Sequence, residues 1–216
     1  MKSQNITDSN IQRFNESAQT WDDEPRRVLM AQKVAAAIKK EIPITNRMKA
    51  LEFGCGTGLV TMELVPFLKS ITAVDTSEQM LDILKQKIQK SRTKNISPLL
   101  TDVLKDGLPN CSYDLIYCSM TLHHIRETDS LIKLFSERLK AGGTLAIADL
   151  EKEDGSFHDD NAGVAHHGFT YFELETLFEN NGLSNIKAVT VHTIKKEKNN
   201  GEVKEYPVFL MQGKKT

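Results

Sequence analysis

The pattern of hydrophobic and polar positions changes between two periods along most of the chain. Short apolar runs, typical of buried strands, alternate with longer segments in which apolar residues recur every three or four positions, as on one face of a helix. The predicted strands are 49–53, 71–74, 96–101, 113–118 and 144–148, and the predicted helices among them are 59–64, 77–90 and 127–140. This alternation predicts a parallel sheet covered by helices on both faces.

The segments on either side of this central region have different patterns. Residues 1–20 are polar and weakly patterned. A helix is expected to begin near Pro25, because proline is favoured in a first helical turn, and to end at Pro43. Gly142-Gly143, after the helix at 127–140, is expected to end that helix before the fifth strand.

Beyond residue 150 the alternation stops. A polar stretch, 151–168, leads to a helix whose start carries the capping-box pattern Thr170-x-x-Glu173. Asn181-Gly182 is a typical helix end, so the helix is expected to stop there.

The C-terminal part of the chain predicts a hairpin. Two strand-like runs, Asn185–Ile194 and Tyr206–Met211, flank Asn199-Asn200-Gly201. Asn-Gly is a strong signal for a two-residue hairpin turn. The last two strands are therefore expected to pair antiparallel.

Composition places the chain among ordinary globular proteins. It has 216 residues, of which 39% are hydrophobic and 26% charged, with a formal net charge of −1. The balanced charge gives no basic excess for a nucleic acid, and no apolar run is long enough for a signal peptide or a membrane span. The three cysteines lack a CxxC spacing, which fits a reducing cytoplasm, and Cys111 and Cys118 are expected to be buried. The oligomeric state is not readable from these features.

The segment with the clearest chemistry is the glycine-rich turn between the first strand and its helix. Gly54, Gly56 and Gly58 let the backbone turn sharply and let a ligand approach the N-terminus of the following helix. A dinucleotide site would have its third glycine at position 59, which is Leu59. Glu52 precedes the turn, and a carboxylate there suits a cation better than a pyrophosphate. S-adenosylmethionine carries an ammonium and a sulfonium group and no phosphate.

Two further acids end predicted strands. Asp75 ends the second strand, where a carboxylate can accept hydrogen bonds from both hydroxyls of a ribose. Met80 lies one helical turn further on, where it can cover an adenine ring. Asp102 ends the third strand and can accept from the adenine amino group, beside the backbone of Val103.

Five segments together resemble the successive motifs of class I S-adenosylmethionine-dependent methyltransferases, and most closely the subgroup related to ubiquinone- and menaquinone-biosynthesis methyltransferases. The resemblance covers residues 49–149, about half of the chain. The segments are Leu51–Gly58, Val74-Asp75, Thr101-Asp102, Tyr113–Ser119 and Leu139–Leu145.

The resemblance implies a fold and a cofactor. The fold is α/β: a doubly wound, mostly parallel, seven-stranded sheet in the order 3-2-1-4-5-7-6, with strand 7 antiparallel and helices on both faces. Residues 1–216 then form one domain, with a helical cover (1–48), a cofactor-binding core (49–150) and an acceptor-side segment (151–216). The cofactor is S-adenosylmethionine, and the product is S-adenosylhomocysteine. The residues implied in cofactor binding are Glu52, Gly54, Cys55, Gly56, Gly58, Asp75, Thr76, Met80, Asp102, Val103 and Ser119.

In-line methyl transfer depends mainly on alignment, and a base helps only when the acceptor must lose a proton. His123 and His124 follow the fourth strand on its cofactor side and are the candidate bases, although they can equally begin a helix and bond locally. The candidates for acceptor binding are Trp21, Glu151, His158, His166 and His167. No standard metal-ligand spacing occurs, so no metal is expected.

A small molecule is the expected acceptor. The stretch Ser119–His124 lacks the Asp/Asn-Pro-Pro-aromatic run of enzymes that methylate base amino groups, and Cys111 does not follow proline, as the nucleophile of cytosine-carbon enzymes usually does. Two alternatives stay open: a binding module that keeps the cofactor pocket without chemistry, and a nicotinamide-dependent oxidoreductase.

Overall fold

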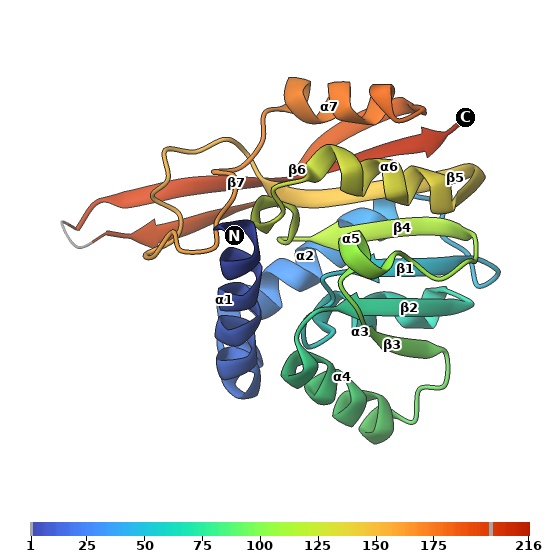
Figure 1. Cartoon of the computed structure of the whole chain (residues 1–216), viewed down its shortest axis with the longest axis horizontal. Helices are drawn as coiled ribbons and strands as arrows, with labels where there is room; N and C mark the ends of the chain where they lie inside the picture. The colour runs from blue at the N-terminus through green and yellow to red at the C-terminus, as the bar shows by residue number, and fades with distance from the viewer. Residues whose placement is uncertain (1, 199–200) are drawn as a thin grey trace.

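The protein is built around one twisted seven-stranded sheet. The computed structural model describes residues 2–198 and 201–216 and gives the strand order β3-β2-β1-β4-β5-β7-β6. Strands β1 to β5 pair in parallel, and β7 pairs antiparallel with both β5 and β6. The predicted order and the antiparallel last pair are therefore confirmed (Figure 1).

The strands and helices follow the predicted sequence of elements, with ends that differ by a few residues. The strands are β1 (Lys49–Phe53), β2 (Ser70–Asp75), β3 (Ile96–Leu100), β4 (Tyr113–Ser119), β5 (Leu139–Leu150), β6 (Leu183–Glu197) and β7 (Val203–Lys215). The α-helices are α1 (Lys2–Ser17), α2 (Pro25–Glu41), α3 (Leu59–Leu64), α4 (Glu78–Ser91), α5 (Val103–Asp106), α6 (Thr128–Arg138) and α7 (Tyr171–Asn180). Short 3-10 helices are η1 (Ala18–Asp23), η2 (Val65–Phe67) and η3 (Leu122–His124).

Two hydrophobic cores, one on each face of the sheet, hold the layers together. Successive strand residues point to opposite faces, so Tyr117 belongs to the core beneath α2, α3 and α4, whereas Ile116 and Cys118 belong to the core beneath α5, α6 and α7. The central strands are buried on both sides for this reason. Burial of both faces explains why their sequences are nearly continuous apolar runs.

Three expectations differ from the structure. Gly142-Gly143 does not end α6: the helix stops at Arg138, and both glycines lie within β5, beside a shift in its register with β4. Cys111 is exposed rather than buried, because it precedes β4 in a surface loop, whereas Cys118 is buried. The expected turn at 199–201 lies partly outside the described residues.

The N-terminal helix is positioned over the functional edge of the sheet. The weakly patterned residues at the start of the chain form α1, which lies across the carboxyl ends of the parallel strands (Figure 1). On the same side of the molecule as α1, the β6–β7 hairpin extends past the other strands, and the loop before α7 runs beside it (Figure 1). Lys196 Nζ donates to the Phe157 carbonyl at 2.5 Å, and Tyr206 Oη donates to the Ser156 carbonyl at 3.0 Å. These bonds hold the loop against the hairpin.

The capping box of α7 gives a stability prediction. Thr170 Oγ1 accepts from the Glu173 backbone N–H at 3.1 Å, and Glu173 Oε2 accepts from the Thr170 N–H at 2.9 Å. Thr170→Ala should lower the free energy of unfolding by about 1 kcal/mol in urea titrations. Thr176→Ala, which removes only a bond to the Phe172 carbonyl within the same helix, should change it by less than about 0.5 kcal/mol. Equal losses in both variants would contradict a role for the cap.

Candidate active site

The glycine turn has three left-handed residues with different surroundings. Gly54, Gly56 and Gly58 have φ values of +66°, +53° and +81°. A Cβ on Gly54 would lie 2.3 Å from the Thr121 side chain, and one on Gly58 would lie 2.4 Å from Leu84. A Cβ on Gly56 would meet only the Met80 sulfur, at 4.0 Å. Gly54 and Gly58 are therefore required by packing, whereas Gly56 faces open space where a ligand can approach.

Asp75 fixes the shape of this turn from the end of β2. Its Oδ2 accepts the Gly56 N–H at 2.7 Å, and its Oδ1 accepts the Ser77 N–H at 2.8 Å. Burial raises the pKa of Asp75, although the backbone donors from Ser77 and Gly56 oppose that effect. Each oxygen keeps a lone pair, so the carboxylate can still accept hydroxyl groups from a ligand.

Glu52 lies beneath the turn and is 2% exposed. Its Oε2 accepts hydrogen bonds from Thr61 Oγ1 and from Tyr117 Oη, the latter at 3.0 Å. Burial raises the pKa of Glu52 to about 7 in spite of these donors, and the nearby Asp75 adds to the rise. The side chain is thus poised between its neutral and charged forms, and a cation above the turn would favour the charged form.

The other residues expected to bind the cofactor surround the same strand ends. Asp102 caps α5, with its Oδ1 accepting the Leu104 N–H at 3.2 Å, and the side chain is about one-fifth exposed. Val103 is buried. Ser119 ends β4 next to Met120, whose φ of +54° is rare for a residue with a side chain. The remaining members of the set are Cys55 and Met80, both buried, and Thr76, which is partly buried.

The N-terminal segment is fastened to the turn by polar contacts. Asp22 Oδ1 accepts from Thr57 Oγ1 at 2.6 Å, and its Oδ2 pairs with Lys87 Nζ at 2.5 Å. In α1, Asn15 Oδ1 accepts from Ser77 Oγ at 2.6 Å. The cover expected at 1–48 therefore contacts the glycine turn and the start of α4 directly.

His123 forms a buried pair with Asp149. Nδ1 of His123 lies 2.7 Å from Asp149 Oδ1, and the two residues are 1% and 0% exposed. Burial opposes the charge of Asp149, but the pairing with His123 and backbone donors outweigh it and lower the pKa of Asp149. A carboxylate at this position requires the proton on Nδ1. Nε2 of His123 has no hydrogen-bond partner in the described part of the chain.

His124 and His158 complete a cluster of imidazole rings around this pair. The His123 ring centroid lies 4.1 Å from that of His124 and 5.1 Å from that of His158, and the Phe14 ring of α1 lies 5.4 Å from His124. His124 Nδ1 donates to the Gly163 carbonyl at 3.0 Å. Burial lowers the pKa of His124 to about 3 and that of His158 to about 4, so both rings are neutral at neutral pH.

Among the remaining acceptor-side candidates, Trp21 reaches this cluster through Phe14, whose ring lies 5.7 Å from that of Trp21. Trp21 also packs under the Arg27 guanidinium, 3.8 Å from the ring centroid, and Glu151 Oε1 accepts from Tyr171 Oη at 2.5 Å. His167 is half exposed and lies 3.6 Å from Glu153. The backbone N–H of His166 donates to the His123 carbonyl at 3.0 Å, but among the acceptor-side histidines only the His158 ring lies with those of His123 and His124.

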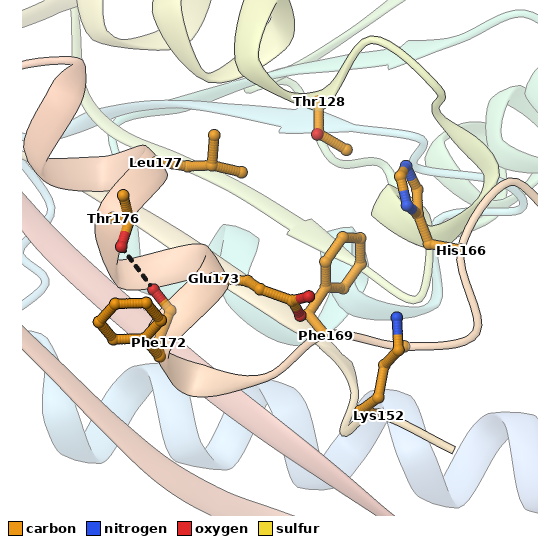
Figure 2. Close-up of a pocket in the computed structure, with 9 residues that line it drawn as sticks. Thr128, Lys152, His166, Phe169, Phe172, Glu173, Thr176 and Leu177 are labelled. Atoms are coloured by element: carbon orange, nitrogen blue, oxygen red, sulfur yellow. Dashed lines mark hydrogen bonds between the residues drawn. The ribbon is translucent and has the colours of Figure 1, made fainter. Parts of the chain in front are cut away.

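His166 lines a separate, open cavity of about 410 Å³ on the α6–α7 face, shown in Figure 2. Its Nε2 donates to the Ile125 carbonyl at 2.9 Å. The exposed ring of Phe172, on α7, lies at the opposite side of this cavity, whereas Lys152 lies on the same side as His166. No residue of the glycine turn lines it, so it is not continuous with the turn.

The residues at the strand ends fit S-adenosylmethionine. The space at Gly56 admits a ligand against the backbone, Asp75 can accept ribose hydroxyls, and Glu52 supplies negative charge near a cation. For a metal the answer differs: among residues 2–198 and 201–216, no group of three or more His, Cys, Asp or Glu side chains has the geometry to hold an ion.

Several contacts of this site were not foreseen from the sequence. Asp149 and Thr121 had no assigned role, yet they hold His123 and Gly54. A signal for Asp149 exists, because it lies near the end of the fifth strand, as Asp75 and Asp102 lie at the ends of the second and third. Thr121 carries no comparable signal, because its contact depends on how distant segments pack.

The raised pKa of Glu52 predicts a pH dependence of stability. A carboxyl group that is harder to ionise in the folded state than in the unfolded state destabilises the fold as pH rises from about 4.5 to about 7. Over that range, the free energy of unfolding of the unliganded chain should fall by about 3 kcal/mol relative to Glu52→Gln. Urea titrations at pH 4.5, 6 and 8 measure this difference. An unchanged difference between the two proteins would show that folding does not raise the pKa of Glu52.

No helix in the described ranges is long and apolar enough to cross a membrane.

Residues 51–145 match the family model described as a methyltransferase domain. An uncharacterized methyltransferase of Schizosaccharomyces pombe is 33% identical over 157 residues, which cover 66% of this chain and 55% of that protein. The ubiquinone biosynthesis O-methyltransferase of Hydrogenovibrio crunogenus is 26% identical over 160 residues, 72% of this chain and 66% of that protein.

The fold also matches solved methyltransferase structures. Phosphoethanolamine N-methyltransferase 2 of Haemonchus contortus, in complex with phosphomonomethylethanolamine and S-adenosylhomocysteine, superimposes with a TM-score of 0.69 at 16% identity, over 84% of this chain and 52% of that one. At this identity the likeness concerns the fold. Together with the methyltransferase-domain match over residues 51–145 and the glycine turn between β1 and α3, it supports a class I S-adenosylmethionine-dependent methyltransferase domain in this chain.

Proposed function

We propose that the chain transfers the methyl group of S-adenosylmethionine to a small-molecule acceptor by in-line displacement. The observation that carries this proposal is the arrangement at the end of β1 and β2, where Gly56 leaves space against the backbone and Asp75 holds the turn open. Two curated relatives named as methyltransferases support it, although the chain spans 55% and 66% of their lengths.

Each cofactor residue has a role that its surroundings support. Glu52 places negative charge beneath the methionyl ammonium and sulfonium groups, and binding of these cations favours its ionised form. Asp75 accepts the ribose hydroxyls with the lone pairs that the backbone donors leave. Asp102 and the backbone of Val103 contact the adenine, and Met80 lies against its face. Ser119 lies beside the methionyl end.

The cofactor supplies an activated methyl group, so this chain must mainly hold the acceptor in line with it and exclude water. The N-terminal cover suits that task, because α1 and η1 fasten across the strand ends through Asp22 and Asn15. A few polar contacts at one edge can open for ligand exchange and close again. The cover therefore encloses the reacting groups during transfer.

A small acceptor fits the surroundings of the strand ends better than a polymer does. His123 is buried, His124 and His158 are partly buried, and Phe14 of α1 packs on His124, so an acceptor that reaches these rings must pass α1. The formal net charge of −1 offers no excess of positive charge to a phosphate backbone. These features favour a small acceptor.

Calorimetric titration with S-adenosylhomocysteine tests the proposal. Micromolar binding is expected for the unmodified chain, and Asp75→Asn should weaken it at least tenfold, because the amide can no longer accept two ribose hydroxyls. Asp82→Asn, on the exposed face of α4, is the matched control and should bind normally. NADH serves as the competing ligand. Tighter binding of NADH than of S-adenosylhomocysteine would overturn the cofactor assignment.

A second prediction distinguishes the effect of filling the ligand space at Gly56 from the effect of straining a left-handed backbone. Gly56→Ala should weaken S-adenosylhomocysteine binding at least tenfold, because the added Cβ enters the ligand space, and should cost about 1 kcal/mol of stability. Gly142→Ala has the same kind of left-handed backbone, at φ +75°, with no atom within 4 Å of the new Cβ. It should lose similar stability and bind normally. Full binding by Gly56→Ala would place the ligand elsewhere.

A further inference from the structure

The His123–Asp149 pair has more organisation than a packing contact needs. Asp149 Oδ2 accepts the backbone N–H of His123 at 3.3 Å, while Oδ1 lies 2.7 Å from the ring nitrogen. The carboxylate therefore fixes the position of the residue and the orientation of the ring together. Such a grip leaves one tautomer, with the proton on Nδ1 and a lone pair on Nε2.

The lone pair on Nε2 is the unexplained feature. A buried nitrogen without a partner costs free energy, and native proteins keep few such groups. Nε2 of His123 and Nε2 of His158 are both buried without a partner in the described residues, and their rings lie 5.1 Å apart. Two unpartnered nitrogens on neighbouring rings mark a place where a ligand's polar hydrogen can bind.

The location connects this place to methyl transfer. His123 comes four residues after the end of β4, and Asp149 lies near the end of β5, so both are at the sheet edge that carries the glycine turn. Thr121, between β4 and His123, packs on Gly54. The segment that shapes the cofactor turn thus also carries the imidazole.

We propose that His123 is the general base for the acceptor and that Asp149 is the residue that positions it, so that the acceptor is a molecule whose reacting O–H or N–H is still protonated when it binds. This inference rests on the proposed function. A thiolate or a carbanion, which needs no base, would leave the pair without a task.

In the step, the acceptor's oxygen or nitrogen forms a bond to the methyl carbon while the carbon–sulfur bond breaks and its electron pair stays on sulfur. Nε2 of His123 takes the acceptor's proton, and Asp149 stabilises the imidazolium that results. The ring of His158, which is only partly buried, lies 5.1 Å from that of His123 and offers a route by which the proton can return to solvent. Atoms and charge balance without a further reactant.

Charged and titratable groups face the imidazole from several elements. Asp149 faces it from β5, His124 from η3 and His158 from the loop, while Arg13 of α1 and Lys196 of β6 contribute positive charge near His158. Among these groups, Asp149 is the one that stabilises positive charge on His123. The carboxylate is therefore placed to stabilise the imidazolium that forms when Nε2 takes the acceptor's proton.

The first test reads the tautomer directly. Nitrogen-15 NMR of the histidine rings, in the full chain saturated with S-adenosylhomocysteine at pH 7.5, should show His123 protonated at Nδ1 and unprotonated at Nε2, with the signal assigned by its loss in His123→Gln. Asp149→Asn should change this tautomer, because its amide can donate to Nδ1. A proton on Nε2 of the unmodified chain would overturn the proposal.

The second test compares two probe acceptors of the same shape, phenol and thiophenol, with labelled methyl donor. His123→Gln should lower kcat for phenol at least about 100-fold, the usual contribution of a general base, and should change kcat for the ionised thiophenol by less than about threefold. Asp149→Asn should lower kcat for phenol and shift its pH profile while leaving KM nearly unchanged. His192→Gln, in β6, is the control for a histidine outside the cluster.

The outcomes separate this inference from the proposed function. Equal losses with both acceptors in variants that still bind S-adenosylhomocysteine, or methylation of thiophenol alone by the unmodified chain, would overturn the role of His123 and leave the methyltransferase assignment intact. Failure of the unmodified chain to bind S-adenosylhomocysteine would overturn the proposed function instead. If neither probe is methylated, the ring tautomer decides.

Discussion

The left-handed turn between β1 and α3 is the constraint on which the rest of the site depends. Gly54 must lack a side chain so that Thr121 can pack on it, and this contact ties the end of β4 to the turn. Asp75 then fixes the middle of the same turn through the Gly56 N–H. Three neighbouring strands are thereby held in one arrangement at their carboxyl ends, where a parallel sheet places its ligands.

The ionisation of the acids at this edge of the sheet is sensitive to their neighbours, because most of these groups are buried. Glu52 has a pKa raised to about 7, whereas the buried Asp149 has a lowered pKa because it is paired with His123. The two carboxyl groups experience similar burial and differ in their partners. The hydroxyl donors of Thr61 and Tyr117 offset the effect of burial on the pKa of Glu52 only partly. The imidazole of His123 and the backbone donors outweigh that effect at Asp149. Partner choice therefore decides which acid is charged before any ligand arrives.

The sequence predicted the architecture well because its periodicity reports burial directly. The strands of the central sheet, the capping box at Thr170 and the antiparallel last pair all follow from local patterns. The end of α6 and the start of β5 did not follow from the local pattern, because Gly142-Gly143 lies within β5, beside a shift in its register with β4. The length of α1 also could not be predicted, because its polar residues Asn10 and Asn15 are fixed by contacts with the Gly163 carbonyl and the start of α4 rather than by an apolar stripe.

For the site, sequence reasoning predicted the glycine turn and the acids that end strands, whose positions follow from chain order. It could not tell His123 from His124, because the difference arises from Asp149, a residue far along the chain.

One further consequence concerns β6, the outer strand of the sheet. It carries the exposed Lys187 and Lys195 among residues that are otherwise mostly half-buried. Such charges discourage another chain from adding a strand, so they protect this edge from aggregation.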